Sequence, residues 1–363
     1  MKQKKIKVLL YVYAAINLGD NLFVYTLLKR YPEIDFYIQV KDKEYQKIYK
    51  EFPNMHFLEE PRNVGIVDVN QYDAIIYVGG SIFMESEYAI HEMKEFNYLI
   101  NQCIGKNKKF FYMSSNFGPY KTKEYLDLAR ENFAISGICF RDKESYELFK
   151  DIKTVRYAPD MAFSLEMPKV RKEKRSIGIS IINLEHRENL KHKTAIYEDL
   201  IRRIMIKFAK RNYSVKLFSF SQFEEDDVAI KRILETLPKE YKEKISIQEF
   251  DGNIDKYLKE YAKMEYMVCT RFHSMILSIL SNQKIYNLTY SKKQDNVIKD
   301  NRLFMIYQKI QDITYETKVR KLYFQKASKS KVKKIIQNSK KQFENLENVK
   351  KQIIAKSEMS GKE

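Results

Sequence analysis

Short hydrophobic runs recur along the first half of the chain, and segments with helical periodicity separate several of them. The expected helices cover Asn21–Arg30, Lys43–Glu51 and Glu144–Lys150, and the expected strands cover Lys7–Tyr13, Phe36–Val40, Ala74–Val78, Lys109–Ser114 and Ile138–Phe140. Strands that alternate with helices are typical of βαβ units. The pattern therefore predicts a parallel sheet in this half of the chain.

The pattern stops at Met167–Arg175, a charged stretch that has no periodicity, and then begins again. The second half predicts strands at Ser176–Ile182, Val215–Phe220, Lys244–Phe250, Tyr266–Thr270 and Lys284–Thr289, and helices at Thr194–Arg211, Asp226–Leu237, Ile254–Met264, Ser274–Ser281 and Gln294–Ile306. We therefore expect an α/β protein with two Rossmann-like, doubly wound domains, residues 1–167 and 168–316, and a cleft between them.

Residues 317–363 form a separate, strongly basic segment. They hold 13 Lys and one Arg against four Glu, more than half of the chain's net charge of +18. Hydrophobic residues recur there at helical spacing, from Val332 to Ile353, which predicts an amphipathic helix. The favoured interpretation is a helix that packs on its own domain or crosses back to the first. The alternative is a basic helix that contacts a membrane surface peripherally, at its inner face.

The composition limits which cellular compartment and which kinds of partner are expected. No run of 18 uncharged apolar residues occurs, so no transmembrane helix is expected. The three cysteines, Cys103, Cys139 and Cys269, fit neither a disulfide framework nor a CxxC metal site, which favours a reducing cytoplasm. No zinc-finger, RNP or helix-turn-helix pattern accompanies the positive charge, so no nucleic-acid partner is expected.

Polar and glycine residues follow the expected strands directly. In open parallel sheets, ligands bind outside the carboxyl ends of the strands, so these positions are candidates for a binding site. In the first domain they are Asn17, Gly19, Asp20, Gly79, Gly80, Ser81, Asn116, Arg141 and Asp142, and in the second Arg271, His273, Tyr290, Lys292 and Lys293. Gly19 also fits a plain turn, Gly79-Gly80 a close approach of helix and strand, and Arg141-Asp142 an ion pair at a helix start.

His273 is the strongest single candidate. It follows Arg271 at the end of a strand and comes immediately before an apolar helix. The N-terminus of a helix carries unpaired N–H groups that favour an anion. A cationic Arg beside a titratable His therefore forms a credible catalytic group. The other four histidines lack such a context.

Several well-known site patterns are absent from the sequence. The glycines at 79–80 lack the full GxGxxG pattern, and no nucleophile elbow, Walker motif or HExxH occurs. Asp226 and Asp227 begin an expected helix, where carboxylates offset the helix dipole. Neither a metal ion nor a redox cofactor is expected.

Six short motifs, taken in order, resemble the polysaccharide pyruvyl transferase family. They span residues 17–293, nearly all of both expected domains: Asn17-Leu18-Gly19-Asp20, Val78-Gly79-Gly80-Ser81, Arg141-Asp142 with Ser145, Pro159-Asp160, Thr270-Arg271-Phe272-His273-Ser274 and Tyr290-Ser291-Lys292-Lys293. Phe272 and Ser81 stand where the family usually has leucine and glycine. The basic segment after Thr317 lies outside the resemblance.

The resemblance implies a GT-B-like arrangement of two Rossmann-like domains with the active site in the cleft. It also implies transfer of pyruvate from phosphoenolpyruvate to a sugar of a cell-envelope or exopolysaccharide intermediate, often lipid-linked, with release of phosphate. The first domain would then take the acceptor and the second the donor. No cofactor is needed for that reaction, in which phosphoenolpyruvate is the donor substrate.

The residue chemistry suits such a donor. Phosphoenolpyruvate carries a carboxylate and a phosphate, and the arginine fork matches both groups. We assign this task to Arg141 and Arg271, assisted by Lys292 or Lys293, and assign acid–base catalysis to His273. Further candidates for substrate binding complete the set: Asn17, Gly19, Asp20, Gly79, Gly80, Ser81, Asn116, Asp142, Ser274 and Tyr290.

Two other functions fit the same architecture. One is a GT-B nucleotide-sugar glycosyltransferase, which would carry an acidic ribose-binding residue late in the second domain, where this chain has Tyr290-Ser291-Lys292-Lys293. The other is a non-catalytic polysaccharide-assembly protein, against which the Arg and His candidates argue.

Overall fold

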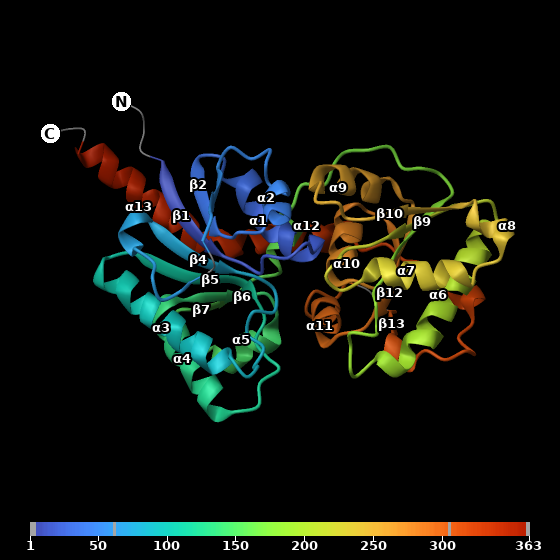
Figure 1. Cartoon of the computed structure of the whole chain (residues 1–363), viewed down its shortest axis with the longest axis horizontal. Coiled ribbons are helices and arrows are strands. Elements are labelled where there is room, and N and C mark those ends of the chain that lie inside the picture. The colour runs from blue at the N-terminus through green and yellow to red at the C-terminus, as the bar shows by residue number, and fades with distance from the viewer. Residues whose placement is uncertain (1–4, 61–62, 304–305, 361–363) are drawn as a thin grey trace. The chain divides into compact units, whose positions relative to one another are not determined.

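The computed structural model describes residues 5–60, 63–303 and 306–360 and contains two compact units (Figure 1). Unit 1 comprises residues 1–14, 20–164 and 336–363, and unit 2 comprises residues 15–19 and 165–335. The chain therefore leaves unit 1 for the five residues 15–19, shortly after its first strand, and it returns to unit 1 at residue 336.

Unit 1 is built on a seven-stranded parallel sheet in the order β3-β2-β1-β4-β5-β6-β7. Its strands are β1 (Ile6–Tyr11), β2 (Ile34–Gln39), β3 (Met55–Leu58), β4 (Ala74–Val78), β5 (Lys109–Ser115), β6 (Ile138–Phe140) and β7 (Val155–Tyr157). Its main helices are α1 (Leu18–Arg30), α2 (Lys43–Lys47), α3 (Ala89–Gly105), α4 (Lys123–Ser136) and α5 (Lys143–Phe149). The order of the strands reverses direction between β1 and β4.

Alternate residues of the central strands of unit 1 point to opposite faces, and both faces are buried, as expected for a parallel sheet. On one face, Leu9, Ile75 and Tyr112 belong to a core cluster together with Phe96 of α3 and Phe133 of α4. The carboxyl ends of the strands are therefore held rigidly by packing on the helices that follow them.

Unit 2 has a six-stranded parallel sheet in the order β10-β9-β8-β11-β12-β13. Its strands are β8 (Ser176–Ser180), β9 (Ser214–Phe218), β10 (Ile245–Gln248), β11 (Tyr266–Cys269), β12 (Lys284–Thr289) and β13 (Gln308–Lys309). Its helices include α6 (Thr194–Ala209), α7 (Asp226–Glu235), α8 (Lys239–Lys242), α9 (Ile254–Lys263), α10 (Phe272–Leu280) and α11 (Lys292–Asp300). The order reverses between β8 and β11.

The prediction of two Rossmann-like, doubly wound units is confirmed by these two sheets. Two predictions of detail were wrong. Strands β3 and β7 were both missed, which made the count of strands in the first half two too low. The helix expected over 294–306 ends at Asp300 and strand β13 begins at Gln308, while residues 304–305 of that expectation lie outside the described residues.

The segment 317–363 is not one helix that stands apart from the fold. It contains α12 (Lys329–Ser339), a 3₁₀ turn (Lys340–Phe343) and α13 (Glu344–Ser360), and from Ile336 onward it belongs to unit 1. Phe343 and Leu346 are fully buried, so the expected amphipathic seam faces the core of unit 1. Residues 1–4 of the expected first domain and residues 361–363 of the expected basic segment lie outside the described residues.

The side chain of Gln342 holds the C-terminal segment on unit 1. Its side-chain oxygen accepts a hydrogen bond from the backbone N–H of Ser114 (3.0 Å), and its Nε2 donates to the carbonyl of Ala158 (2.8 Å). The favoured interpretation left open whether the helix packs on its own domain or crosses back to the first, and these contacts show that residues 336–360 return to unit 1. None of the described helices combines the length and apolar character needed to cross a membrane.

Candidate active site

In unit 2, the reversal of strand order places the carboxyl ends of β8 and β11 side by side. The backbone N–H of Thr270, after β11, donates to Oγ of Ser180 at the end of β8 (2.9 Å). Arg271 is the N-cap residue of α10, and His273 lies in the first turn of that helix. The predicted Arg–His pair therefore stands at the position where doubly wound sheets bind ligands.

Arg271 is almost fully buried, and two carboxylates hold its guanidinium. Its Nε donates to Oδ2 of Asp226 (3.1 Å), its Nη2 forms an ion pair with Oδ1 of the same carboxylate, and its Nη1 forms an ion pair with Glu224. Burial alone would lower the pKa of Arg271, but Asp226 and Glu224 outweigh it and raise that pKa. The guanidinium is therefore fixed in place and charged.

Asp226 is the centre of this network. Its carboxylate accepts hydrogen bonds from the backbone N–H groups of Phe220 (3.0 Å) and Ser221 (3.1 Å) as well as from Arg271. Burial raises the pKa of Asp226, and Arg271 and the backbone donors act against that rise. The sequence interpretation, in which Asp226 only offsets a helix dipole, missed this role, since the partner Arg271 lies far along the chain.

Glu224 connects this network to the predicted residues at the start of α11. It also pairs with Arg187 (2.5 Å), whose guanidinium lies 5.2 Å from the ring centre of Tyr290. The backbone N–H of Tyr290 donates to the side chain of Gln294, which in turn donates to the carbonyl of Thr270 (2.8 Å). Lys292 and Lys293 lie in the first turn of α11, next to these hydrogen bonds in the sequence.

The segment 15–19 belongs to unit 2 and packs against His273. The backbone N–H of Leu18 donates to the carbonyl of Phe220 (2.8 Å), and Asn17 forms a backbone bridge with Ser221. Asn17 also accepts a hydrogen bond from the N–H of Gly19 (3.0 Å). A Cβ added at Gly19 would lie 2.4 Å from Nδ1 of His273, so the glycine lets the backbone touch the imidazole.

Unit 1 holds a second group of predicted residues around Arg141. Its Nη1 forms a buried ion pair with Asp160 (2.8 Å), and its Nη2 donates to the side chain of Asn116 (2.8 Å). Ser81 donates to the same Asn116 oxygen (2.9 Å). A Cβ at Gly80 would lie between 2.7 and 2.9 Å from the guanidinium, so Gly80 gives Arg141 its place beside the backbone.

These two groups contain most of the motifs that carry the family resemblance. The sequence model of the family described as polysaccharide pyruvyl transferase matches residues 17–292, about three quarters of the chain. The chain belongs to the polysaccharide pyruvyl transferase family.

Solved structures similar to this pyruvyl transferase family member share its fold. The S. aureus MnaA–UDP co-structure is 9% identical and covers 86% of both chains with a TM-score of 0.55. A glycosyltransferase from Rickettsia africae is 10% identical and covers 97% of this chain and 99% of its own, with a TM-score of 0.54. Anabaena HepE with UDP-glucose is 7% identical, covers 98% and 100%, and has a TM-score of 0.53. No curated protein matches significantly.

Three predicted substrate-binding residues of this family member hold structural contacts. Asp142 is the N-cap of α5, and its carboxylate accepts from the backbone N–H of Ser145 (2.9 Å). Ser274 is fully buried with its hydroxyl 2.7 Å from that of Tyr261. The carbonyl of Gly79 accepts a hydrogen bond from Ser115 (2.8 Å). Each contact fixes the loop or helix that presents the neighbouring candidate residue.

The other predicted residues lie in the two groups or at their helix starts, with Asp20 in the first turn of α1. Sequence reasoning about this family member missed Arg187, Glu224 and Asp226. The only available signal was the position of the two carboxylates just after strand β9. Among the described residues, no group of three or more His, Cys, Asp and Glu side chains could hold a metal ion.

Proposed function

We propose that this protein transfers the pyruvyl group of phosphoenolpyruvate to a saccharide and releases phosphate. A proton adds to the enol methylene, which becomes the methyl group of the product. One sugar hydroxyl then bonds to the carbon that carries the phosphate, and a second hydroxyl of the same sugar displaces the phosphate to close a ketal. Of the two hydroxyl protons, one restores the catalytic acid and the other leaves with phosphate.

The contact between Gly19 and His273 is the observation that carries this proposal. An acid–base group has to be held at a fixed position relative to the atom that it protonates. The imidazole lies against backbone on one side, at the start of α10, and its neighbour Arg271 is fixed by two carboxylates. We assign proton transfer to the enol methylene to His273.

Arg271 alone does not supply the positive charge that binds the anionic donor substrate. Asp226 and Glu224 offset the charges of Arg271 and Arg187, so these four side chains together are close to neutral. Arginine has five N–H donors, and the contacts with Asp226 and Glu224 use three of those in Arg271. We assign the remaining Arg271 donors to the carboxylate or phosphate of the donor, and the surplus positive charge to Lys292 and Lys293.

The acceptor role falls to the polar group in unit 1. Ser81 and Asn116 are hydrogen-bond groups of the type that recognise sugar hydroxyls, and Arg141 orients the Asn116 amide. In this role Arg141 is a positioning residue for Asn116, and Asp160 is its counter-charge. The alternative is the role predicted from the sequence, in which Arg141 binds the carboxylate of the donor. Asp20 and the glycines at 79–80 complete the proposed acceptor side.

The test compares His273→Ala with His192→Ala, an exposed histidine that serves as the matched control. Phosphate release from phosphoenolpyruvate is measured with and without lipid-linked and free saccharide acceptors. We expect acceptor-dependent release by the native protein and by His192→Ala, and a fall of about 10²–10⁴-fold for His273→Ala at an unchanged melting temperature. Equal turnover by both variants would remove His273 from the mechanism.

A nucleotide-sugar glycosyltransferase is the second candidate, since two of the similar folds were solved with UDP or UDP-glucose. Thermal stability measured with phosphoenolpyruvate and with UDP separates the two functions. We expect phosphoenolpyruvate to raise the melting temperature of the native protein. Stabilisation by UDP alone favours the glycosyltransferase.

A further inference from the structure

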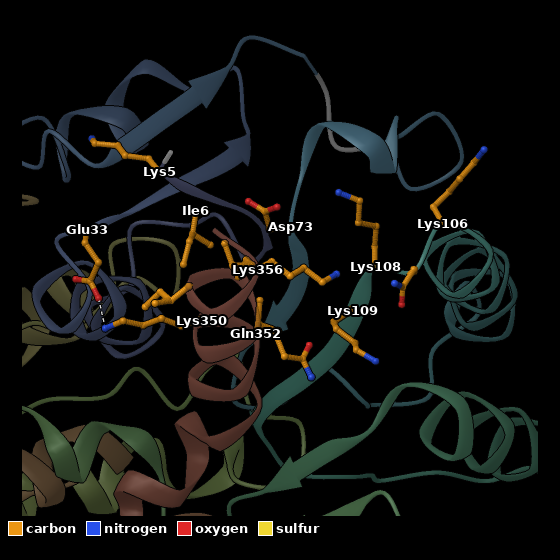
Figure 2. A pocket seen from close by; sticks show the side chains of 14 residues that line it. Lys5, Ile6, Glu33, Asp73, Lys106, Lys108, Lys109, Lys350, Gln352 and Lys356 are labelled. Carbon is orange, nitrogen blue, oxygen red and sulfur yellow. Dashed lines mark hydrogen bonds and ion pairs between the residues drawn. The ribbon is translucent and has the colours of Figure 1, made fainter. Parts of the chain in front are cut away.

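A pocket of about 610 Å³ lies in unit 1 against the C-terminal helix α13 (Figure 2). Its lining includes Lys5 and Ile6 at the start of β1, Asp73 just before β4, and Lys109 at the start of β5. These are the amino ends of parallel strands, whereas the residues assigned to the acceptor follow the carboxyl ends of the strands. The pocket is therefore distinct from the candidate active site.

The lining combines an apolar floor with a basic rim. Ile6, Val349, Ile353 and Ile354 supply apolar surface. The rim carries two carboxylates, Glu33 and Asp73, against six lysines from segments far apart in the sequence: Lys5, Lys106, Lys108, Lys109, Lys350 and Lys356. Figure 2 shows Lys350 and Lys356 on α13, with Lys5 on one side of this helix and Lys106, Lys108 and Lys109 on the other. The positive charge of this pocket arises only when the chain is folded.

Contacts within the protein neutralise part of this charge. Lys350 pairs with Glu33, and Lys5 pairs with Asp35 (2.8 Å). Lys106 and Lys109, in the segment between α3 and β5, are exposed, and Lys108 donates to the backbone carbonyl of Asn70 at 3.5 Å. The rim therefore keeps a surplus of positive charge on the α3–β5 segment.

We propose that this pocket docks the protein on an anionic lipid surface. The lysines would bind lipid phosphates, and the isoleucines would contact the first carbons of an acyl chain. Basic residues near such a surface are attracted to its anionic headgroups, and the attraction grows with each added lysine. No aromatic side chain is among the described residues that line the pocket, and single-stranded nucleic acid usually binds by stacking on aromatic rings. A small free anion would leave the apolar floor unused.

The proposed docking surface uses a different part of the C-terminal segment from the amphipathic seam. The amphipathic seam expected from the sequence is used inside unit 1, where Phe343 and Leu346 are fully buried. Ile353 and Ile354, two turns further along α13, are only half-buried. The docking surface is therefore built by the last described turns of α13 together with the α3–β5 segment.

The experiment measures binding of the full chain to vesicles of phosphatidylglycerol and of phosphatidylcholine by co-sedimentation. The test variant carries Lys106→Gln, Lys108→Gln and Lys109→Gln. The matched control carries Lys239→Gln, Lys242→Gln and Lys259→Gln, three exposed lysines of unit 2. Both variants lose the same charge, and circular dichroism and the melting temperature check that both remain folded.

We expect the native protein to bind phosphatidylglycerol vesicles and not phosphatidylcholine vesicles. The test variant should lose affinity by on the order of 100-fold, and the control should stay within a few-fold of the native protein. A further variant, Ile353→Ser, should lose the binding that persists at high salt, where electrostatic attraction is screened.

Equal losses in the test and control variants would overturn the proposal, since they would show attraction to the overall charge of the chain. Native protein that binds single-stranded RNA or an acidic peptide, and no vesicles, would overturn it as well. Binding is measured without substrates, so the result does not depend on the proposed transferase reaction.

Discussion

Gly19 touches the imidazole of His273: a methyl group at Gly19 would lie 2.4 Å from Nδ1 of the ring. Segment 15–19 supplies this glycine, and its backbone bonds to Phe220 and Ser221 keep it there. A loop that follows the first strand of unit 1 thus determines where the candidate acid–base group of unit 2 can lie. The absence of a side chain at Gly19 is what permits this arrangement.

The first prediction concerns Gly19→Ala. The added methyl group has to push the His273 ring from its position, so we expect acceptor-dependent phosphate release to fall by about 100-fold, since small misplacements of a catalytic group are costly. The melting temperature should change by only a few degrees. Gly105→Ala is the control, because no heavy atom of the described residues, apart from its chain neighbours and its own helix backbone, lies within 4 Å of its added Cβ. If both variants retain native turnover, the contact does not position His273.

The second prediction concerns Asp160→Asn, which removes the carboxylate that neutralises the buried guanidinium of Arg141. Breaking a buried pair at one side destabilises proteins by about 3–5 kcal/mol, and we expect a loss of about 3 kcal/mol in the free energy of unfolding. Asp127→Asn breaks an exposed pair with Lys123 and should cost less than about 1 kcal/mol. Denaturant unfolding measures both, and equal costs would contradict the prediction.

The third prediction concerns the pH dependence of stability at Glu224. Burial alone would raise the pKa of Glu224, but Arg271 and Arg187 outweigh it and hold that pKa below the ordinary value of 4.5. The unfolded chain therefore takes up this proton at higher pH than the folded protein does. The stability that Glu224 contributes is fully present above about pH 4.5 and is lost as the pH falls through the folded pKa.

We therefore expect the native protein to be more stable than Glu224→Gln at neutral pH, with the difference shrinking below about pH 4.5. Urea unfolding of both proteins at a series of pH values measures it. A difference that stays constant down to about pH 3 would show that the ion pairs with Arg271 and Arg187 do not stabilise the fold.

The fourth prediction concerns Gln342→Glu. The amide Nε2 of Gln342 donates to the carbonyl of Ala158, and a carboxylate oxygen in its place would face that carbonyl without a proton to share. We expect the free energy of unfolding to fall by about 2–4 kcal/mol, from a lost buried hydrogen bond and a buried charge. Gln352→Glu, on the exposed side of α13, is the control and should be near neutral. Similar values for the two would mean that Gln342 does not hold the C-terminal segment on unit 1.

Much of the fold follows from local patterns in the sequence. Strands such as Ala74–Val78 and Lys284–Thr289 are short apolar runs bounded by glycine, lysine or polar residues, and they lie where the pattern predicts them. Three short strands, β3 (Met55–Leu58), β7 (Val155–Tyr157) and β13 (Gln308–Lys309), were missed because a partly buried strand of a few residues has no clear periodicity. The same local reasoning placed Arg271 and His273 at a strand end, since the carboxyl ends of parallel strands share one edge.

The sequence by itself determined the two parallel sheets and the strand-end positions of the candidate residues, because periodicity and turn residues act over a few neighbouring positions. Only the tertiary structure decided the partners: Asp226 for Arg271, Asp160 for Arg141, Gly19 for His273 and Gln342 for the return of the C-terminal segment. These contacts join residues far apart in the chain. They depend on how the crossovers bring strand ends together, and no local pattern records that.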